Sequence, residues 1–227
     1  MIVNPHLQKK YTQFTSPIKD FATLDNLIYT ANEDGSISIK NANNAKMKPK
    51  HIKAHHNEIT SLSLSSNEFF LASSSIDNTI KIWNLMDKYN PKPYTIKSHT
   101  GCVRSVSFSR DSSLLISASD DKTAKIFQVQ GQKFVSSLKG HANWLTTAEF
   151  SKTDNTKAIT AGTDRTVMLW DVNRRMAVHT QKGYCCKVNV AKYFDNDKSK
   201  LNRLCKWRQQ RCDQNLRHEK QGAHSAL

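Results

Sequence analysis

The chain repeats itself about every 43 residues, and this period limits its possible folds more than any other feature. Three stretches read "SSSIDNTIKIW", "SASDDKTAKIF" and "TAGTDRTVMLW", and they end at Trp83, Phe127 and Trp170. Their aspartates recur at intervals of 44 and 43 residues, as Asp77, Asp121 and Asp164. A fainter copy, "TANEDGSISIK", contains Asp34 and has Lys40 in place of the aromatic residue. A period of this length predicts stacked units of one supersecondary structure.

A second motif keeps the same period and lies before an alternating stretch. It reads "KAHHNEITSLSLS", "KSHTGCVRSVSFS" and "KGHANWLTTAEFS", and its histidines are His55, His99 and His141. A partial copy, "KGYCCKVNVAKYF", has Tyr184 at the position of the histidine. Short alternating strands between polar turns predict four-stranded blades. We therefore expect an all-β propeller that is incomplete, with about four to five blades.

These motifs resemble those of the WD-repeat family, in which Gly-His precedes the inner strand and Trp-Asp ends the third strand. "KGH" at Lys139–His141 and "LWDV" at Leu169–Val172 fit this pattern. The resemblance implies a hydrogen-bonded set of His, Ser/Thr, Asp and Trp in each blade. Here the implied structural tetrads are His55, Ser73, Asp77 and Trp83; His99, Ser117, Asp121 and Phe127; and His141, Thr160, Asp164 and Trp170.

The recurrence of these residues also bears on catalysis. A Ser–His–Asp set can form a nucleophilic triad, but a triad occurs once, in a cleft. Three copies at matched positions indicate a structural role, since a buried aspartate needs several donors around it. We therefore assign no catalytic residue, no metal ligand and no cofactor, and we expect no enzyme. Phe127 has no N–H, so the tetrad of His99 should be one hydrogen bond short.

Binding residues are expected at the mouth of the propeller, where loops vary between repeats. The WD-repeat resemblance places ten residues there: Glu33, Glu58, Thr60, Ile76, Cys102, Arg104, Asp120, Trp144, Thr146 and Thr163. Trp144 is either an interface anchor or packs on the neighbouring blade. Arg104 can pair with an acidic partner. Asp120 either faces outward with a specific role or is a solvated turn residue.

Composition indicates the class of partner. The net charge of +15 favours polyanionic partners such as an acidic protein surface, acidic membranes or nucleic acid. No dense basic block with interleaved aromatic residues is present, which argues against a dedicated nucleic-acid site.

Cysteine usage and hydropathy indicate the compartment. The five cysteines form no C-x-x-C pair, so we expect free thiols, at least one of them buried in a strand, rather than zinc or disulfides. No apolar run is long enough to span a membrane, and the polar N-terminus argues against a signal peptide. We therefore expect a cytosolic, reducing compartment.

The block from His99 to Ser151 further resembles the centriolar WD-repeat proteins of the proteome-of-centriole (Poc) family. "VRSV", "SASDDKT", "QKF" and "H-x-N-W" occur there in the same order, and the opening "NPHLQKKYTQF" is also similar. This resemblance implies a seven-bladed propeller that is a scaffold of centrioles, basal bodies and the cytoskeleton. Its implied partners are proteins, such as the tubulin of the microtubule wall or other centriolar components. The alternative is a WD-repeat adaptor of another assembly, such as a ubiquitin-ligase receptor or a ribonucleoprotein component.

The repeat ends near residue 196, so we divide the chain into a partial propeller, 1–196, and a basic tail, 197–227. The tail is either a disordered or helical arm, or it is read from a shifted frame of the gene. Since an incomplete ring exposes a blade face and a strand edge, we expect poor solubility or closure by a partner.

Overall fold

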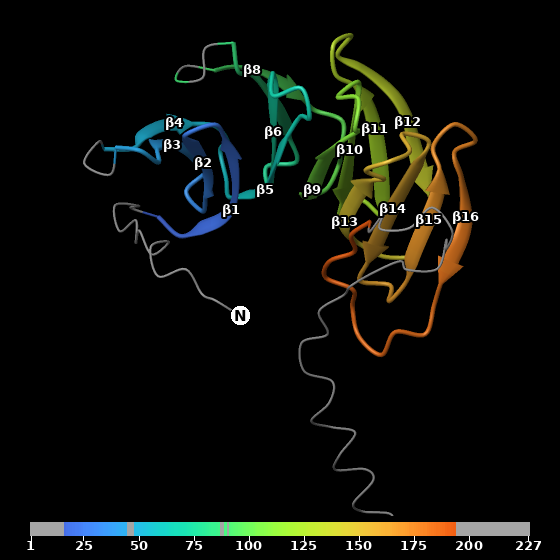
Figure 1. Ribbon diagram of the computed structural model, residues 1–227. Helices are drawn as coiled ribbons and strands as arrows, with labels where there is room; N and C mark the ends of the chain where they lie inside the picture. Colours follow the sequence, from blue (N-terminus) through green and yellow to red (C-terminus); the bar gives the residue numbers. More distant parts are fainter. Residues whose placement is uncertain (1–15, 45–47, 87–88, 90, 194–227) are drawn as a thin grey trace, which may run out of the picture.

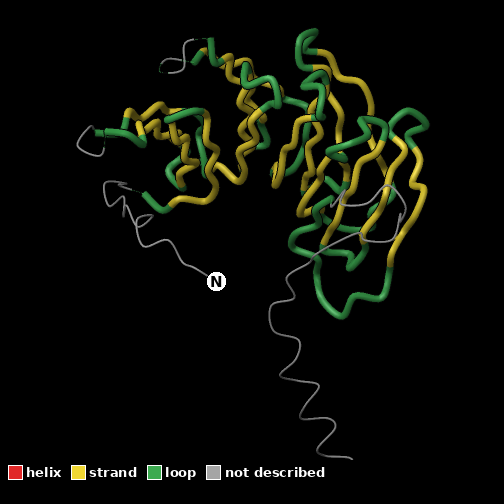
Figure 2. The backbone as a smooth tube through the Cα atoms, in the orientation of Figure 1, coloured by secondary structure: helices red, strands yellow, loops and turns green. Residues whose placement is uncertain are grey.

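The structure is a computed structural model, and it describes residues 16–44, 48–86, 89 and 91–193. Figure 2 shows only strands, turns and loops in this part of the chain, with no helix. Sixteen strands form four antiparallel sheets of four strands each. The expected all-β fold of four-stranded blades is therefore confirmed. The predicted tail, residues 197–227, lies outside the described residues.

The described residues include no helix with the length and hydropathy needed to cross a bilayer.

The first two sheets each run in chain order from their first to their fourth strand. The first contains β1 (Ile18–Leu24), β2 (Leu27–Asn32), β3 (Ser36–Asn41) and β4 (Lys50–Lys53). The second contains β5 (Ile59–Leu64), β6 (Phe70–Ser75), β7 (Ile80–Asn84) and β8 (Lys92–Ile96).

The third and fourth sheets repeat this order. The third contains β9 (Val103–Phe108), β10 (Leu114–Ser119), β11 (Thr123–Gln128) and β12 (Lys133–Lys139). The fourth contains β13 (Leu145–Phe150), β14 (Lys157–Gly162), β15 (Val167–Asp171) and β16 (Met176–Gln181). We refer to the four sheets as blades 1 to 4.

The four blades stand side by side in an open arc (Figure 1). The first strands of successive blades, β1, β5, β9 and β13, contact one another and form the inner side. The fourth strands, β4, β8, β12 and β16, lie on the outside. This is the arrangement of propeller blades, and the described residues do not close the ring.

The core lies between neighbouring blades, because each inner strand packs on the blade before it. Ile59 and Leu62 of β5 share a cluster with Leu24 and Tyr29 of blade 1. Blades 2 and 3 share a second cluster, and blades 3 and 4 share a third. The second and third strands, buried on both faces, are accordingly short continuous runs of apolar and small residues, such as "LLISAS" in β10.

The turns between the second and third strands have a common backbone geometry. The residue after each turn aspartate has a positive φ: 79° at Gly35, 65° at Asn78, 68° at Lys122 and 63° at Arg165. Only the first of these is a glycine, where a Cβ would lie 2.6 Å from the carbonyl oxygen of Asn57. The left-handed residue reverses the chain within two positions and directs the aspartate back toward the blade.

The partial copy after blade 4 packs like an inner strand, although the structure assigns it no strand. The amide of Val188 donates to the carbonyl of Gly162 at 3.2 Å. Val188 and Ala191 are buried against Ile159 and Val167 of blade 4. The sequence expectation of four to five blades thus corresponds to four complete sheets and one covering segment.

Candidate functional site

The repeated polar residues meet inside the blades in the same arrangement. In blade 2, His55 Nε2 lies 2.8 Å from Ser73 Oγ, and Trp83 Nε1 donates to the same oxygen at 3.0 Å. The other ring nitrogen, Nδ1, lies 3.1 Å from Asp77 Oδ2. The serine hydroxyl therefore joins the histidine to the tryptophan, and the histidine joins both to the turn.

Blade 4 has the same set of contacts as blade 2, including the tryptophan. In blade 4, His141 contacts Asp164 and Thr160 at 2.7 Å each, and Trp170 Nε1 donates to Thr160 at 2.8 Å.

In blade 3, His99 contacts Asp121 and Ser117 at 2.7 Å each. Phe127 is buried at the position of the tryptophan but offers no donor. Ser117 Oγ instead donates to the carbonyl of Lys125 at 3.3 Å.

Sequence reasoning missed a further member of each set, the threonine two residues after the aspartate. Thr79, Thr123 and Thr166 donate through both the amide and the hydroxyl to Oδ1 of their aspartates, at 2.6–3.1 Å. The signal was present in the sequence, since "DNT", "DKT" and "DRT" keep the same period. The repeated unit therefore contains Asp-x-Thr.

The pKa of the histidine is shifted in the same direction in all three sets. Burial lowers the pKa of His55, His99 and His141 below the ordinary value, although the neighbouring aspartate acts in the opposite direction.

Burial alone would raise the pKa of Asp121, but hydrogen bonds from Thr123 and His99 outweigh it and hold the pKa below its ordinary range. The sets therefore contain ionised carboxylates and neutral imidazoles near pH 7.

In blade 1, hydrogen bonds between residues two to six positions apart take the place of this set. Asp34 accepts from the amide of Ser36 at 2.9 Å and from its hydroxyl at 2.6 Å. Asn32 donates to Ser36 and Ser38 at 2.9 and 2.6 Å. The segment that should supply its histidine position, Gln13-Phe14, lies outside the described residues.

The sets have the residue types of a catalytic triad but not its accessibility. Ser73, Ser117 and Thr160 are each 0% exposed. A nucleophile must reach its substrate, and these hydroxyls are enclosed by their own blades. The arrangement stabilises the turn between the second and third strands in blades 2, 3 and 4.

Those turns support the rim residues through one repeated hydrogen bond. The amides of Ile76, Asp120 and Thr163 donate to the carbonyls of Glu58, Cys102 and Trp144 at 3.1, 2.9 and 2.8 Å. Each bond joins the residue before the turn aspartate to the residue directly before the inner strand. Six of the ten predicted rim residues thus form adjacent pairs within blades 2, 3 and 4.

Arg104 and Asp120 form an ion pair with each other, which the sequence analysis did not foresee. Arg104 Nη2 lies 2.6 Å from Asp120 Oδ2, and Nε donates to Oδ1 at 2.9 Å. The Asp120 side chain is only 13% exposed. The expectation that Asp120 faces outward is therefore corrected, and Arg104 already pairs with an acidic group of its own blade: a fork of donors on β9 reaches the turn.

The remaining charged rim residues, Glu33 and Glu58, both lie near one lysine. Lys19 of β1, which sequence reasoning missed, lies 3.0 Å from Glu58 and 3.9 Å from Glu33. A hydrogen bond to Glu58 raises the pKa of Lys19. With Arg104 and Asp120, the charged rim positions comprise two cations and three anions. These five positions therefore contribute no net positive charge.

Trp144 is the predicted rim residue whose large apolar side chain is exposed, whereas Ile76 is half-buried. Trp144 precedes β13 and is 51% exposed, so it does not pack fully on a neighbouring blade. Two other predicted rim residues turn inward: Thr60 donates to the carbonyl of Val103 at 2.6 Å, and Thr146 to that of Val188 at 2.6 Å. Thr60 thus joins β5 to β9, and Thr146 joins β13 to the covering segment after blade 4.

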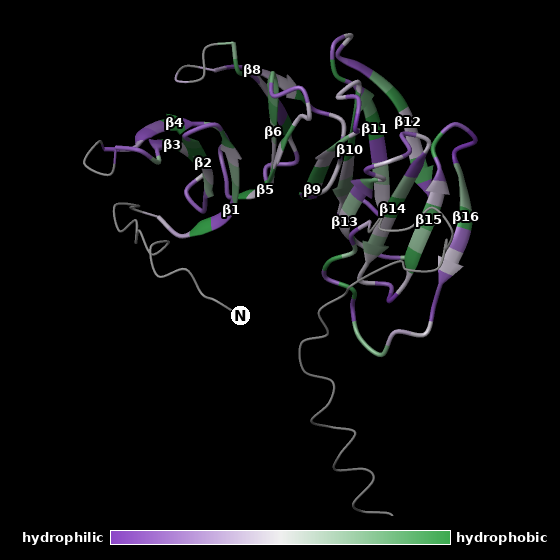
Figure 3. Cartoon of the chain, viewed as in Figure 1, coloured by the Kyte–Doolittle hydropathy of each residue, from purple (hydrophilic) through white to green (hydrophobic). Residues whose placement is uncertain are grey.

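The outer strands differ from the rim in charge. They contain five lysines and no aspartate or glutamate, and all five are exposed: Lys50, Lys53, Lys92, Lys133 and Lys139. Figure 3 shows β4 as a hydrophilic strand at one end of the arc. We call these residues the outer lysines. Sequence reasoning found the charge but not its place.

The expectation of a cysteine buried in a strand is wrong for the described cysteines. Cys102 is partly exposed and precedes β9 by one residue. Cys185 is exposed and Cys186 partly exposed, both in the covering segment after blade 4. Cys205 and Cys212 lie outside the described residues.

Comparison with known families agrees with this geometry. The family described as WD domain, G-beta repeat matches residues 47–84, 91–128 and 132–171. The three matches end at the last residues of β7, β11 and β15, the third strands of blades 2, 3 and 4. No curated protein matches the chain significantly.

Proposed function

The chain belongs to the WD domain, G-beta repeat family, and we propose that it is a non-enzymatic scaffold of centrioles or basal bodies that docks on the microtubule wall. WD repeats are protein-interaction modules, so a scaffold or adaptor role follows from the family. The cytoskeletal role, with its support of centriole stability and cilium assembly, is the finer proposal.

The outer lysines carry this proposal. They lie on three of the four outer strands, which face away from the inner side, and no carboxylate lies within those strands. An acidic protein surface such as the tubulin wall is complementary to them, whereas the charged residues predicted at the rim, with Lys19, are close to neutral. The similarity of the block His99–Ser151 to centriolar WD-repeat proteins supports the same class of partner.

Two features support the absence of enzymatic activity. The Ser–His–Asp sets recur in three blades, and their hydroxyls are inaccessible. Each set makes the contacts that fix a turn of its own blade, which is a structural role.

Co-sedimentation with microtubules over a salt series tests the docking. We expect binding at low salt that weakens as the ionic strength rises, because salt screens exposed charges. The double variant Lys133→Gln/Lys139→Gln should weaken binding, and Trp144→Ala should leave it unchanged. Absence of binding at low salt, or equal loss in the two variants, contradicts docking through the outer lysines.

A generic WD-repeat adaptor is the second candidate, and the exposed Trp144 favours it. An aromatic side chain on a rigid rim is a common anchor for a partner chain. The cellular position of the tagged chain separates the two: basal bodies support the scaffold, and a nucleolar or diffuse signal supports the adaptor.

A further inference from the structure

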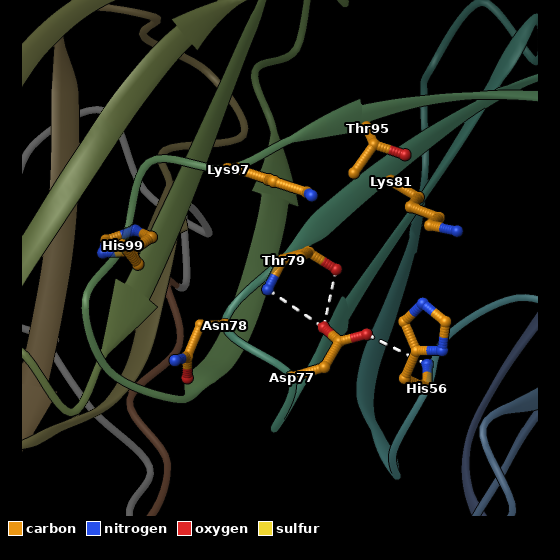
Figure 4. A pocket seen from close by; sticks show the side chains of 8 residues that line it. All are labelled: His56, Asp77, Asn78, Thr79, Lys81, Thr95, Lys97 and His99. Atoms are coloured by element: carbon orange, nitrogen blue, oxygen red, sulfur yellow. Dashed lines mark hydrogen bonds between the residues drawn. The ribbon is translucent and has the colours of Figure 1, made fainter.

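A polar pocket lies between blade 2 and the start of blade 3. Its volume is about 610 Å³. Figure 4 shows its lining side chains, which come from the turn after β6, from β7 and β8, and from the segments before β5 and β9. Lys81 and Thr95 lie opposite each other on β7 and β8, and Lys97 follows β8 directly. Two cations and several hydrogen-bond donors thus share one cavity.

The two lysines have no counter-charge of their own. Among the residues that the structure describes, neither ammonium group has a hydrogen bond or an ion pair with the protein. The equivalent of Lys81 in blade 3, Lys125, instead donates to the carbonyl of Ser98 and lies 4.0 Å from Asp121. In blade 4 the corresponding residue is Met168. The arrangement in blade 2 is therefore particular to this pocket.

The carboxylate in the pocket is already occupied. Asp77 Oδ1 accepts from the amide and hydroxyl of Thr79 at 3.0 and 2.6 Å. Oδ2 accepts from the amide of His56 at 3.1 Å and lies 3.1 Å from His55 Nδ1. With these contacts made, Asp77 has little capacity left for the lysines, and the three side chains leave a net charge of +1.

The walls of the pocket are held in place by the tetrads on either side. Asp77 belongs to the set of blade 2, and His99, which also lines the pocket, is held by Asp121 and Ser117 at 2.7 Å each. A rigid wall lowers the entropy that a ligand loses on binding. The pocket is thus preorganised, and its lysines are the adaptable part.

We propose that this pocket binds the phosphate group of a phosphorylated serine or threonine in a partner protein. The two unpaired ammonium groups and the net charge of +1 favour an anionic ligand. A phosphate monoester carries about −1.5 to −2 charges and suits two ammonium groups better than a single carboxylate does.

The size of the pocket and the proposed scaffold function indicate that the phosphate is borne by a protein. The volume lies within the range of about 300–1,000 Å³ that holds ligands larger than a simple ion. Residues flanking the phosphorylated side chain would fill the remaining space. This inference rests on the proposed interaction function, and none of the outer lysines lines the pocket.

Titration of the full chain with small probes, followed by amide NMR, tests the pocket. The probes are inorganic phosphate, N-acetyl-phosphothreonine amide and N-acetyl-threonine amide. We expect saturable shifts at the amides of Asn78, Thr79 and Lys97, with phosphothreonine amide binding more tightly than phosphate. The unphosphorylated probe should produce no saturable shift.

Three matched variants separate a site from general charge. Lys81→Gln and Lys97→Gln should each weaken binding of phosphothreonine amide about tenfold, because each removes a charged hydrogen bond. Lys139→Gln removes the exposed lysine that follows Leu138 in blade 3 as Lys97 follows Ile96 in blade 2, and it should change the affinity less than about twofold. Equal weakening in all three variants, no saturable shift, or equal binding of the unphosphorylated probe would each overturn the proposal.

The outcome is independent of microtubule docking. Lys139→Gln contributes to the docking test and not to the pocket, and Lys81→Gln does the reverse. Tighter binding of inorganic phosphate than of phosphothreonine amide would overturn the assignment to a protein-borne phosphate, while the co-sedimentation result would stand unchanged.

Discussion

The hydroxyl of Ser73 contacts two side chains, whereas the equivalent hydroxyl of Ser117 contacts one side chain and a backbone carbonyl. His55 and Trp83 both depend on Ser73. In blade 3 the indole donor is missing because Phe127 occupies its place. The same substitution should therefore have different costs in the two blades.

We expect Ser73→Ala to lower the free energy of unfolding by about 1 kcal/mol more than Ser117→Ala, since it leaves a buried indole N–H without an acceptor. Chemical denaturation of the two variants measures the difference. The double variant Trp83→Phe/Ser73→Ala completes the comparison: relative to Trp83→Phe alone, the excess cost of losing the serine hydroxyl should disappear. Equal losses for the two serine variants would contradict this account.

Among the secondary-structure elements, the inner strands show what a neighbouring blade contributes. Phe21 of β1 and Leu62 of β5 occupy the same register position, opposite Thr30 and Ser73 of their second strands. Leu62 is 7% exposed because it packs on blade 1, and Phe21 is 64% exposed. Among the described residues, no blade covers β1 from the other side.

Leu62→Ala should therefore cost about 2–5 kcal/mol of stability, in the usual range for a buried leucine. Phe21→Ala should cost less than about 1 kcal/mol, although it removes a larger side chain. Denaturant unfolding of both variants, at equal protein concentration, measures the two effects. A large loss for Phe21→Ala would mean that another surface covers β1 in solution.

Across the protein as a whole, the repeated sets couple stability to pH. The pKa values of His55, His99 and His141 lie below the ordinary value in the folded chain, chiefly because of burial. The unfolded chain therefore binds protons at these histidines more readily. Their contribution to stability is complete above the unfolded pKa of about 6.5 and falls as the pH drops below it.

We expect the free energy of unfolding to decrease below about pH 6.5, by up to about 1.4 kcal/mol per pH unit for each histidine. A second loss should begin below about pH 3.9, because the pKa values of Asp77, Asp121 and Asp164 are also lowered. Thermal or denaturant unfolding at a series of pH values across both ranges measures the slope. His99→Asn should reduce the slope near the histidine transition.

The repeat, and with it the blade, could be predicted from the amino-acid sequence alone. The period of the His and Asp motifs predicted all-β units of four strands, and Ser, His, Asp and Trp at matched offsets indicated which residues share a blade. Such contacts are local: His55 and Asp77 are 22 residues apart, and Ser73 and Trp83 are 10 apart. A periodic pattern therefore records them.

Contacts between residues that do not follow the repeat, across turns and between blades, could be identified only from the tertiary structure. The fold paired Arg104 with Asp120, joined Lys19 to Glu58 and exposed Trp144. It also separated the near-neutral rim from the outer lysines and placed two further lysines in one pocket. Charge and burial depend on distance in space, and the repeat specifies a residue's place in its blade but not which side chains face it.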